Sequence, residues 1–288
     1  MNARVAQDGT VPGPLVGPEW LAERLGRPGV VVLDASVGAK RGLGPWIPGA
    51  RLFDIDGELS AHGPGLPPHT MPDADRFTAA VRGLGLNDGD RAVVYDAAGI
   101  YSAARAWWML RAMGLVRVAV LDGGLPGWRA AGLPVAEEAP DPSSYGRGNF
   151  TARPRSGAFV GLDEVRRALA DEGRTVLDAR SRGRFAGTEP EPRAGLRGGH
   201  MPGAVNLPFT ELQDGTGRML PERELRARFD ELPDGGRQLV VSCGSGVTAC
   251  VLALGAELAG RREVAVYDGS WSEWGAADAG TPVRLGEG

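Results

Sequence analysis

The chain has 288 residues, 42% hydrophobic and 24% charged, so one large or two ordinary domains are expected and wholesale disorder is excluded. The formal net charge of −4 disfavours binding to a nucleic-acid backbone, which selects concentrated positive charge. Two cysteines are too few for a disulfide framework or a four-thiolate zinc site, and the first residues lack the apolar segment of a signal peptide, so we expect a cytoplasmic protein.

The first half of the chain alternates between strand-like and helix-like segments. Short runs rich in Val and Leu suit strands buried on both faces of a parallel sheet, and they lie at Val30–Leu33, Ala92–Tyr95 and Arg117–Leu121. Helical spacing predicts helices over Asp73–Leu84 and Ser102–Met113.

The second half repeats this alternation after a segment typical of a linker, Glu137–Ser156, which contains three prolines. Helices are predicted at Leu162–Ala170, Glu222–Phe229 and Val247–Leu258. We therefore expect an N-terminal domain over 1–138, a linker over 139–156 and a C-terminal domain over 157–288.

One uncharged stretch, Leu239–Ala256, approaches the length of a membrane-spanning helix. Its first part is strand-like, and it contains several glycine and serine residues. A buried strand, a loop and a helix explain it better than a membrane span. We therefore expect no binding to a membrane.

Four motifs of the first half recur in the same order in the second half. The pairs are Val31–Ala35 with Thr175–Ala179, Ile47–Ala50 with Met201–Ala204, Val93–Asp96 with Val240–Cys243, and Val118–Gly123 with Val264–Gly269. Their spacing drifts, which indicates a duplication followed by changes in loop length. We predict an α/β fold of two similar domains, each a mostly parallel sheet flanked by helices, with ligands beyond the carboxyl ends of the strands.

The most informative loop runs from Cys243 to Cys250. A strand ends at Cys243, a loop with two glycines follows, and a helix is predicted to begin near Val247. Glycines let the backbone turn several N–H groups toward one point, and these groups, with the positive end of the helix, stabilise an anion. We therefore expect Cys243 to be a nucleophilic thiolate at neutral pH. Cys250, one turn into the helix, is expected to pack as a small apolar residue.

At these residues the sequence resembles the tandem-domain rhodanese-type sulfurtransferases, from about Leu15 to Val283. The loop is most similar to that of the family members that use 3-mercaptopyruvate, whereas members that prefer thiosulfate tend to carry basic residues after the cysteine. The resemblance implies two rhodanese-like domains and a donor-binding loop formed by Gly244, Gly246, Val247 and Thr248. It also implies a non-catalytic first domain, because Asp96 stands at the position of Cys243 and cannot carry a persulfide.

Two arginines, Arg184 and Arg193, follow the strand predicted to end at Asp178 and project from the same sheet edge as the cysteine loop. Two neighbouring guanidinium groups can hold the carboxylate and the ketone of an α-keto acid through paired hydrogen bonds. Composition alone favours ordinary surface arginines, but the resemblance implies that these two bind the donor. We expect Arg180 and Arg182 to be structural or solvated.

The resemblance further implies a proton relay from Ser245 to a histidine and an aspartate of the N-terminal domain. Asp56 and His69 match the segments that supply them. A Pro/Gly-rich stretch between them, Gly63–Pro68, looks longer than in the family, so His62 is an alternative to His69.

These residues predict a sulfurtransferase that moves sulfane sulfur from 3-mercaptopyruvate to a thiol, a thioredoxin-like protein or cyanide through a persulfide on Cys243. No metal or organic cofactor is required, because Cys243 carries the sulfur. Thiosulfate is the alternative donor, and a non-catalytic sulfur-binding or sensing module is a further alternative. A cysteine-dependent phosphatase is disfavoured, because its loop needs a phosphate-binding arginine that Gly246, Val247 and Thr248 do not supply. The expected partners are a small-molecule donor and a thiol acceptor, not nucleic acid or membrane.

Overall fold

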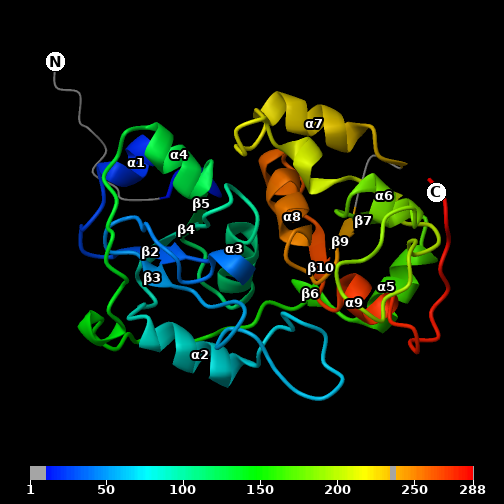
Figure 1. Ribbon diagram of the computed structural model, residues 1–288, viewed down its shortest axis with the longest axis horizontal. Helices are drawn as coiled ribbons and strands as arrows, with labels where there is room; N and C mark the ends of the chain where they lie inside the picture. Colours follow the sequence, from blue (N-terminus) through cyan, green and yellow to red (C-terminus); the bar gives the residue numbers. More distant parts are fainter. Residues whose placement is uncertain (1–10, 234–237, 288) are drawn as a thin grey trace.

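The computed structural model describes residues 11–233 and 238–287 and places them in two lobes that lie side by side (Figure 1). In this part of the chain, each lobe contains a five-stranded sheet in which every pairing is parallel. The strand orders are β1-β5-β4-β2-β3 and β6-β10-β9-β7-β8, which is the same order in both copies. The predicted α/β fold of two duplicated domains is confirmed.

The first lobe contains the sheet of β1 to β5 and the helices that flank it. Its elements are β1 (Leu15–Val16), α1 (Pro18–Ala22), β2 (Val30–Asp34), η1 (Gly38–Lys40), β3 (Arg51–Leu52), α2 (Ala74–Gly83), β4 (Arg91–Tyr95), α3 (Ala103–Ala112), β5 (Val118–Leu121) and α4 (Gly124–Ala130).

The second lobe repeats this arrangement after a connector that carries η2 (Pro142–Ser144). Its elements are β6 (Phe159–Val160), α5 (Leu162–Leu169), β7 (Arg174–Asp178), α6 (Arg182–Ala186), β8 (Val205–Asn206), η3 (Phe209–Leu212), α7 (Glu222–Asp230), β9 (Gln238–Ser242), α8 (Ala249–Leu258), β10 (Val264–Tyr267) and α9 (Ser270–Trp274).

The predicted strands and long helices lie within a few residues of the observed ones. The main difference concerns α8, which begins at Ala249 rather than near Val247. Gly246 adopts a left-handed conformation with φ of 74°, so the loop after β9 is longer than its sequence suggests. Strands of two residues and helices of five, such as α6 and α9, were not predicted because they are too short to show a period.

The connector between the lobes is attached to the first lobe. Phe150 is buried and packs edge-on against Phe77 of α2, and its backbone N–H donates to the carbonyl of Leu86. The chain then enters β6, at the edge of the second sheet.

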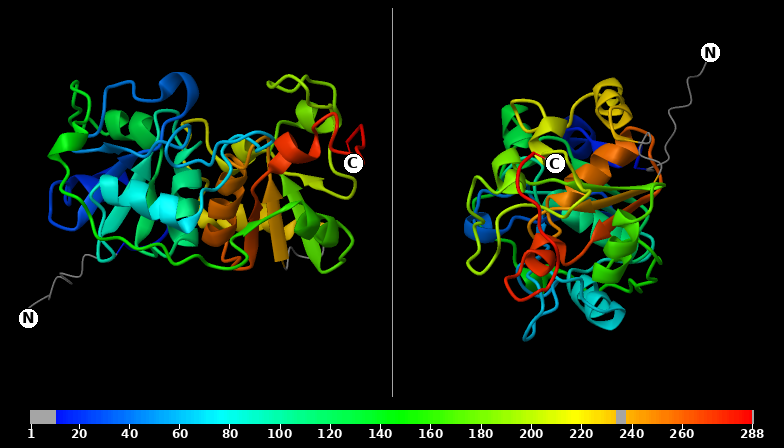
Figure 2. Two further views of the ribbon diagram at one scale, coloured as in Figure 1. Left: turned by 90° about the horizontal axis from the view of Figure 1, so that it is seen from below. Right: turned by 90° about the vertical axis from the view of Figure 1, so that its right-hand side faces the viewer.

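The two lobes meet where α3 packs against α8, as Figure 1 and the left view of Figure 2 show. Both helices are buried on nearly all sides, because each lies between its own sheet and the other lobe. This position explains why the stretch Leu239–Ala256 carries no charge. Among the described residues, no helix is both long and apolar enough to cross a membrane.

Candidate active site

A cavity of about 350 Å³ opens at the carboxyl edge of the second sheet, where ligands of parallel sheets are expected. Residues from both lobes line it. Nine of the ten site residues predicted from the sequence are among them, namely Cys243, Gly244, Ser245, Val247, Thr248, Arg184, Arg193, His69 and Asp56. The tenth, Gly246, lies in the same loop.

Cys243 follows β9 directly, and only 2% of its surface is exposed. The carbonyl groups of its loop point into the protein. The carbonyl of Cys243 accepts from the N–H of Trp271 at 2.9 Å, and that of Gly244 accepts from the N–H of Ser272 at 2.9 Å and its Oγ at 2.7 Å. α9 therefore holds one side of the loop through its carbonyl oxygens.

The amide groups of this loop consequently face the other way, because the C=O and N–H of a trans peptide point in opposite directions. Within residues 11–233 and 238–287, no backbone N–H from Gly244 to Ala249 donates to a protein acceptor. Free amides gathered in one loop form an anion-binding concavity. The loop around Cys243 therefore has the donors that a thiolate or a persulfide anion requires.

The first lobe shows how such a loop surrounds an anion. Asp96 follows β4 as Cys243 follows β9, and its carboxylate turns into its own loop. Oδ1 accepts from the N–H of Ala98 at 2.8 Å, and Oδ2 accepts from those of Tyr101, Ser102 and Ala103 at 2.8 to 2.9 Å. In the first lobe the carboxylate occupies the concavity, whereas in the second lobe the concavity faces the open cavity.

Ser245, His69 and Asp56 form a continuous chain of hydrogen bonds. His69 Nδ1 lies 2.9 Å from Ser245 Oγ, and His69 Nε2 lies 2.9 Å from Asp56 Oδ1. The carboxylate of Asp56 also accepts from the N–H of Gly38 at 2.6 Å. A carboxylate can only accept when ionised, so Nε2 carries the proton and Nδ1 accepts from the serine hydroxyl.

Burial lowers the pKa of His69, against the opposing effect of the hydrogen bond and charge of Asp56. The imidazole is therefore neutral at pH 7 and able to accept a proton through Ser245. His69 also has a positive φ of 63°, which is uncommon for a residue other than glycine.

The alternative histidine, His62, lies outside this arrangement. It is exposed, and its Nε2 contacts the carbonyl of Gly57 at 2.9 Å. The third histidine, His200, is buried in the second lobe and stacks on Phe185. Of the three, His69 alone lines the cavity.

The two predicted donor-binding arginines differ in how they are paired. Arg184 donates through Nε and Nη2 to the two oxygens of Glu191, at 3.2 and 2.6 Å. Glu191 also accepts from Arg180 at 2.8 Å, and Arg180 pairs with the buried Asp178. This cluster of two arginines and two carboxylates has no net charge.

Arg193 forms no hydrogen bond or ion pair with any residue that the structure describes. It lines the cavity as an uncompensated cation beside the cysteine loop. Gly244 lies close to both arginines, since a Cβ at Gly244 would be 3.0 Å from Arg184 Nη2 and 3.9 Å from Arg193 Nη1. Both guanidinium groups therefore approach the loop over a glycine.

Cys250 is fully buried in the core, as its place in the helix predicts, and burial raises its pKa to about 12. Its thiol donates to the carbonyl of Gly246 at 3.3 Å. Of the two cysteines, Cys243 lines the cavity and Cys250 does not.

Sequence reasoning missed two residues that organise the site, Glu191 and Arg105. Glu191 orients Arg184. It stands between two prolines in the segment that joins Arg184 to Arg193, and nothing in that pattern predicts a pairing role. Arg105 donates to the carbonyl groups of His69 and Gly246. A charged residue inside the apolar stretch Ala103–Ala112 is the signal that could have revealed it.

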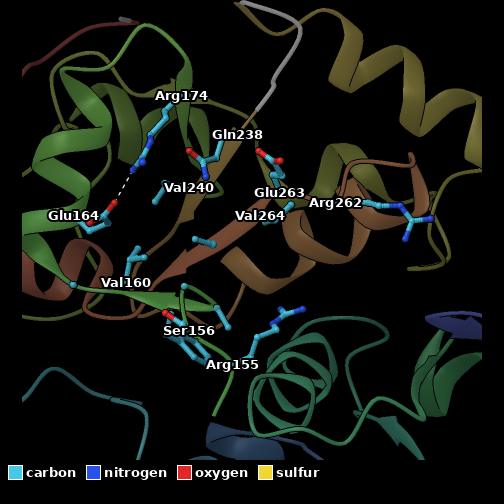
Figure 3. A pocket seen from close by; sticks show the side chains of 15 residues that line it. Arg155, Ser156, Val160, Glu164, Arg174, Gln238, Val240, Arg262, Glu263 and Val264 are labelled. Atoms are coloured by element: carbon cyan, nitrogen blue, oxygen red, sulfur yellow. Dashed lines mark hydrogen bonds and ion pairs between the residues drawn. The ribbon is translucent and has the colours of Figure 1, made fainter. Parts of the chain in front are cut away.

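A larger cavity of about 690 Å³ lies at the opposite edge of the second sheet (Figure 3). Its lining includes Arg174, Gln238 and Val264, the first residues of β7, β9 and β10. Figure 3 shows Arg174 paired with Glu164 across this cavity. Among the described residues that line it there is no cysteine or histidine, so the candidate reactive groups are those at the carboxyl edge.

Comparison with known proteins shows the family to which the chain belongs. The family model of the rhodanese-like domain matches residues 17–131 and 161–277, one copy per lobe. The chain is 40% identical over 279 residues to the 3-mercaptopyruvate sulfurtransferase of Escherichia coli strain K12, covering 93% of this chain and 97% of that protein.

Two further comparisons agree. The mitochondrial thiosulfate/3-mercaptopyruvate sulfurtransferase 1 of Arabidopsis thaliana is 39% identical over 297 residues, covering 91% of this chain and 76% of that protein. The crystal structure of the 3-mercaptopyruvate sulfotransferase SseA from Escherichia coli superimposes with a TM-score of 0.79 at 38% identity, covering 91% of this chain and all of the other.

Proposed function

Because the chain belongs to the rhodanese-like sulfurtransferases, a family of enzymes, we propose that it moves sulfur from 3-mercaptopyruvate to a thiol through a persulfide on Cys243. The observation that supports this most directly is the surroundings of Cys243. Its loop offers free amides, and the cavity beside it contains the Ser245–His69–Asp56 chain and the unpaired Arg193.

The donor carboxylate pairs with Arg193, which has no hydrogen-bond or ion-pair partner among the described residues. Arg184 is held by Glu191 and offers its remaining N–H groups to the ketone oxygen. These two contacts orient the donor sulfur toward Cys243. Holding the two sulfur atoms together removes much of the entropic cost of the reaction.

In the first half-reaction the Cys243 thiolate attacks the donor sulfur, so an S–S bond forms and the C–S bond of the donor breaks. The electron pair of the C–S bond passes to carbon, which gives the enolate of pyruvate. The proton of the donor thiol passes through Ser245 to His69 and then to the enolate carbon. Cys243 remains as a persulfide anion, which the amides from Gly244 to Ala249 stabilise.

In the second half-reaction an acceptor thiolate attacks the outer sulfur of the persulfide. The S–S bond to Cys243 breaks, and the Cys243 thiolate is restored. A small thiol or a thioredoxin-like protein fits this role in a cell, and cyanide fits it in an assay. No step calls for a metal or an organic cofactor, because Cys243 itself carries the sulfur.

Thiosulfate is the alternative donor, and the pairing of the two arginines favours 3-mercaptopyruvate. Arg184 is neutralised within its cluster, and the loop residues after Cys243 are uncharged. Arg193 is thus the arginine of this pair that has no carboxylate partner among the described residues, and one free guanidinium group matches a single donor carboxylate better than a dianion.

The experiment that tests this proposal is intact-protein mass spectrometry after incubation with each donor, together with kcat/KM for both donors. We expect a gain of one sulfur atom with 3-mercaptopyruvate and none in Cys243→Ser. Preference for thiosulfate would overturn the donor assignment. Absence of added sulfur with either donor would favour a binding or sensing module.

A further inference from the structure

Arg105 is a fully buried arginine of the first lobe whose guanidinium group reaches the second lobe. It stands in the first turn of α3, among apolar side chains, and none of its surface is exposed. Arginine is almost never fully buried unless its donors and charge are satisfied. The partners of Arg105 therefore indicate what the protein gains from placing it there.

Three acceptors receive N–H groups of Nη1 and Nη2, whereas Nε has no hydrogen-bond partner among the described residues. Nη2 donates to the carbonyl of His69 at 2.7 Å and to Asp268 Oδ1 at 2.7 Å, and Nη1 donates to the carbonyl of Gly246 at 3.3 Å. The guanidinium lies 4.5 Å from the ring centroid of Phe159. One side chain thus joins α3 to the histidine segment of its own lobe and to the cysteine loop of the other.

Both carbonyl groups belong to residues with a left-handed backbone conformation. His69 has φ of 63° and Gly246 has φ of 74°. A fixed carbonyl fixes the orientation of its whole peptide plane. At His69 this fixes the backbone from which the imidazole reaches Ser245. At Gly246, whose carbonyl also accepts from the Cys250 thiol, it turns the N–H of Val247, a residue that lines the cavity, away from Arg105.

We propose that Arg105 is a positioning residue for sulfur transfer: its planar guanidinium group aligns His69 with Ser245 and directs the Val247 amide toward Cys243. Arg105 does not line the cavity, so it acts through these groups rather than on the donor. The inference rests on the proposed function, because it concerns the relay and the amides that the proposed reaction uses.

The test is a double-mutant cycle of Arg105→Met and His69→Ala, with kcat and KM for 3-mercaptopyruvate. Methionine keeps an apolar chain against Phe159 but has no donor. We expect Arg105→Met to lower kcat about 100-fold with KM changed less than about 3-fold, since misplacement affects chemistry rather than binding. In the His69→Ala background the further loss should be at most about 10-fold, because part of the effect passes through His69. An equal loss in both backgrounds would overturn the proposal.

Two variants separate positioning from stability. Arg111→Met also removes an arginine from α3 and also breaks an ion pair between the lobes, with Glu257 of α8. We expect its kcat to stay within about 2-fold of the parent, since it lies away from the relay. Arg105→Lys keeps the charge beside Asp268 without the planar guanidinium group, so thermal stability should recover while kcat stays at least about 10-fold low. A large kcat loss in Arg111→Met, or full kcat in Arg105→Lys, would refute a positioning role.

The two proposals fail in different ways. If the parent protein takes up no sulfur in the mass spectrum, the proposed function fails. If the parent takes up sulfur and Arg105→Met acts independently of His69→Ala, the positioning role alone fails. Should Arg105→Met not fold, the cycle is run with Arg105→Lys, for which the same dependence on His69 is expected.

Discussion

Two arginines line the cavity beside Cys243, and they differ in how they are paired. Arg184 is held in place by the buried carboxylate of Glu191, which also cancels its charge. Arg193 has no partner among the described residues and keeps its full charge. A guanidinium group that is held in place and whose charge is cancelled suits hydrogen bonding to a ketone oxygen. A guanidinium group without a carboxylate partner suits attraction of a carboxylate.

Replacement of Arg193 by alanine should therefore weaken donor binding more than chemistry. A hydrogen bond to a charged group contributes about 1.5 to 3 kcal/mol, so KM for 3-mercaptopyruvate should rise about 10- to 160-fold. We expect kcat to fall less than about 3-fold, because the carboxylate contact exists before and during sulfur transfer. Steady-state kinetics of Arg193→Ala measures both. The matched control is Arg182→Ala, an exposed arginine paired with Glu211, and a loss of kcat at unchanged KM would contradict this role.

The relay makes a prediction about pH. Burial lowers the pKa of His69 and Asp56 raises it, with burial the larger effect. The neutral base form should thus persist below the ordinary histidine value of about 6.5, and kcat should decline only under that pH. Asp56→Asn removes the opposing effect, so the acid limb of the pH–rate profile should move to still lower pH. An acid limb that is unmoved, or that moves upward, would exclude His69 as the group that titrates.

At the level of elements, the site is a strand, a loop and a helix. Contacts on the protein side of the loop orient its peptide groups. α9 and Arg105 take the carbonyl groups of the loop, and the amides are left for an anion. Gly246 makes this possible. Its φ of 74° is a conformation that side chains disfavour, and a Cβ there would lie 3.0 Å from both Arg105 Nη1 and the carbonyl of Asp268.

Gly246→Ala should therefore disturb both stability and catalysis. A strained left-handed residue costs about 1 to 3 kcal/mol, and the close contact forces the loop to move. We expect the free energy of unfolding to fall by that amount in a urea titration and kcat/KM to fall at least about 10-fold. The control is Gly26→Ala, which has a similar φ of 75° but open space around its Cβ. It should lose stability without losing activity, and equal activity losses would show that the loop contact is irrelevant.

Those parts of the fold and site that depend on local pattern were predictable from the sequence. Apolar runs mark β2, β4 and β5, and the repeats indicate two copies of one sheet. The cysteine loop is read from its glycines and the strand before it. The choice between His62 and His69 was not predictable, because it depends on where a turn before α2 places each ring relative to the other lobe.

The contacts of Arg105 are a second feature that could not be predicted from the sequence. Its acceptors are the carbonyl groups of His69 and Gly246, 36 and 141 positions away in the chain. Backbone carbonyls leave no mark in a sequence, so only the packing of α3 against the second lobe reveals them. Long-range contacts to the backbone are what local patterns omit.

In the whole molecule, the duplicated lobes exchange equivalent contacts. Asp122, after β5, accepts from the N–H of Met219 in the second lobe at 3.0 Å. Asp268, at the matching position after β10, accepts from the N–H of Met71 in the first lobe at 2.8 Å. The loops beside these contacts differ, since Gly217 packs on the filled loop of the first lobe and His69 reaches the open loop of the second. The lobes are thus joined by matching contacts, whereas their loops differ: Asp96 fills the amides of the first loop, and the second loop lines the cavity beside Cys243.

The interface between the lobes makes a prediction about unfolding. One hydrophobic cluster contains buried residues of α3 and of α8, so neither lobe can expose its side of the interface without removing apolar contacts from the other. We expect the lobes to unfold together. Val32 and Val176 occupy matching positions on β2 and β7, in separate clusters away from the interface.

Val32→Ala and Val176→Ala should each lower the free energy of unfolding by about 2 kcal/mol, from lost burial and a small cavity. The measurement is hydrogen exchange by mass spectrometry across a urea series, with peptides from β4 and β9 as probes of the two lobes. If the lobes unfold cooperatively, each substitution should lower the free energy of unfolding by the same amount at both probes. The reason is that destabilising one lobe then destabilises the core that both lobes share. If Val32→Ala shifts β4 alone and Val176→Ala shifts β9 alone, the lobes are independent. The alignment of His69 with Ser245 would then depend on contacts such as those of Arg105, not on the shared core.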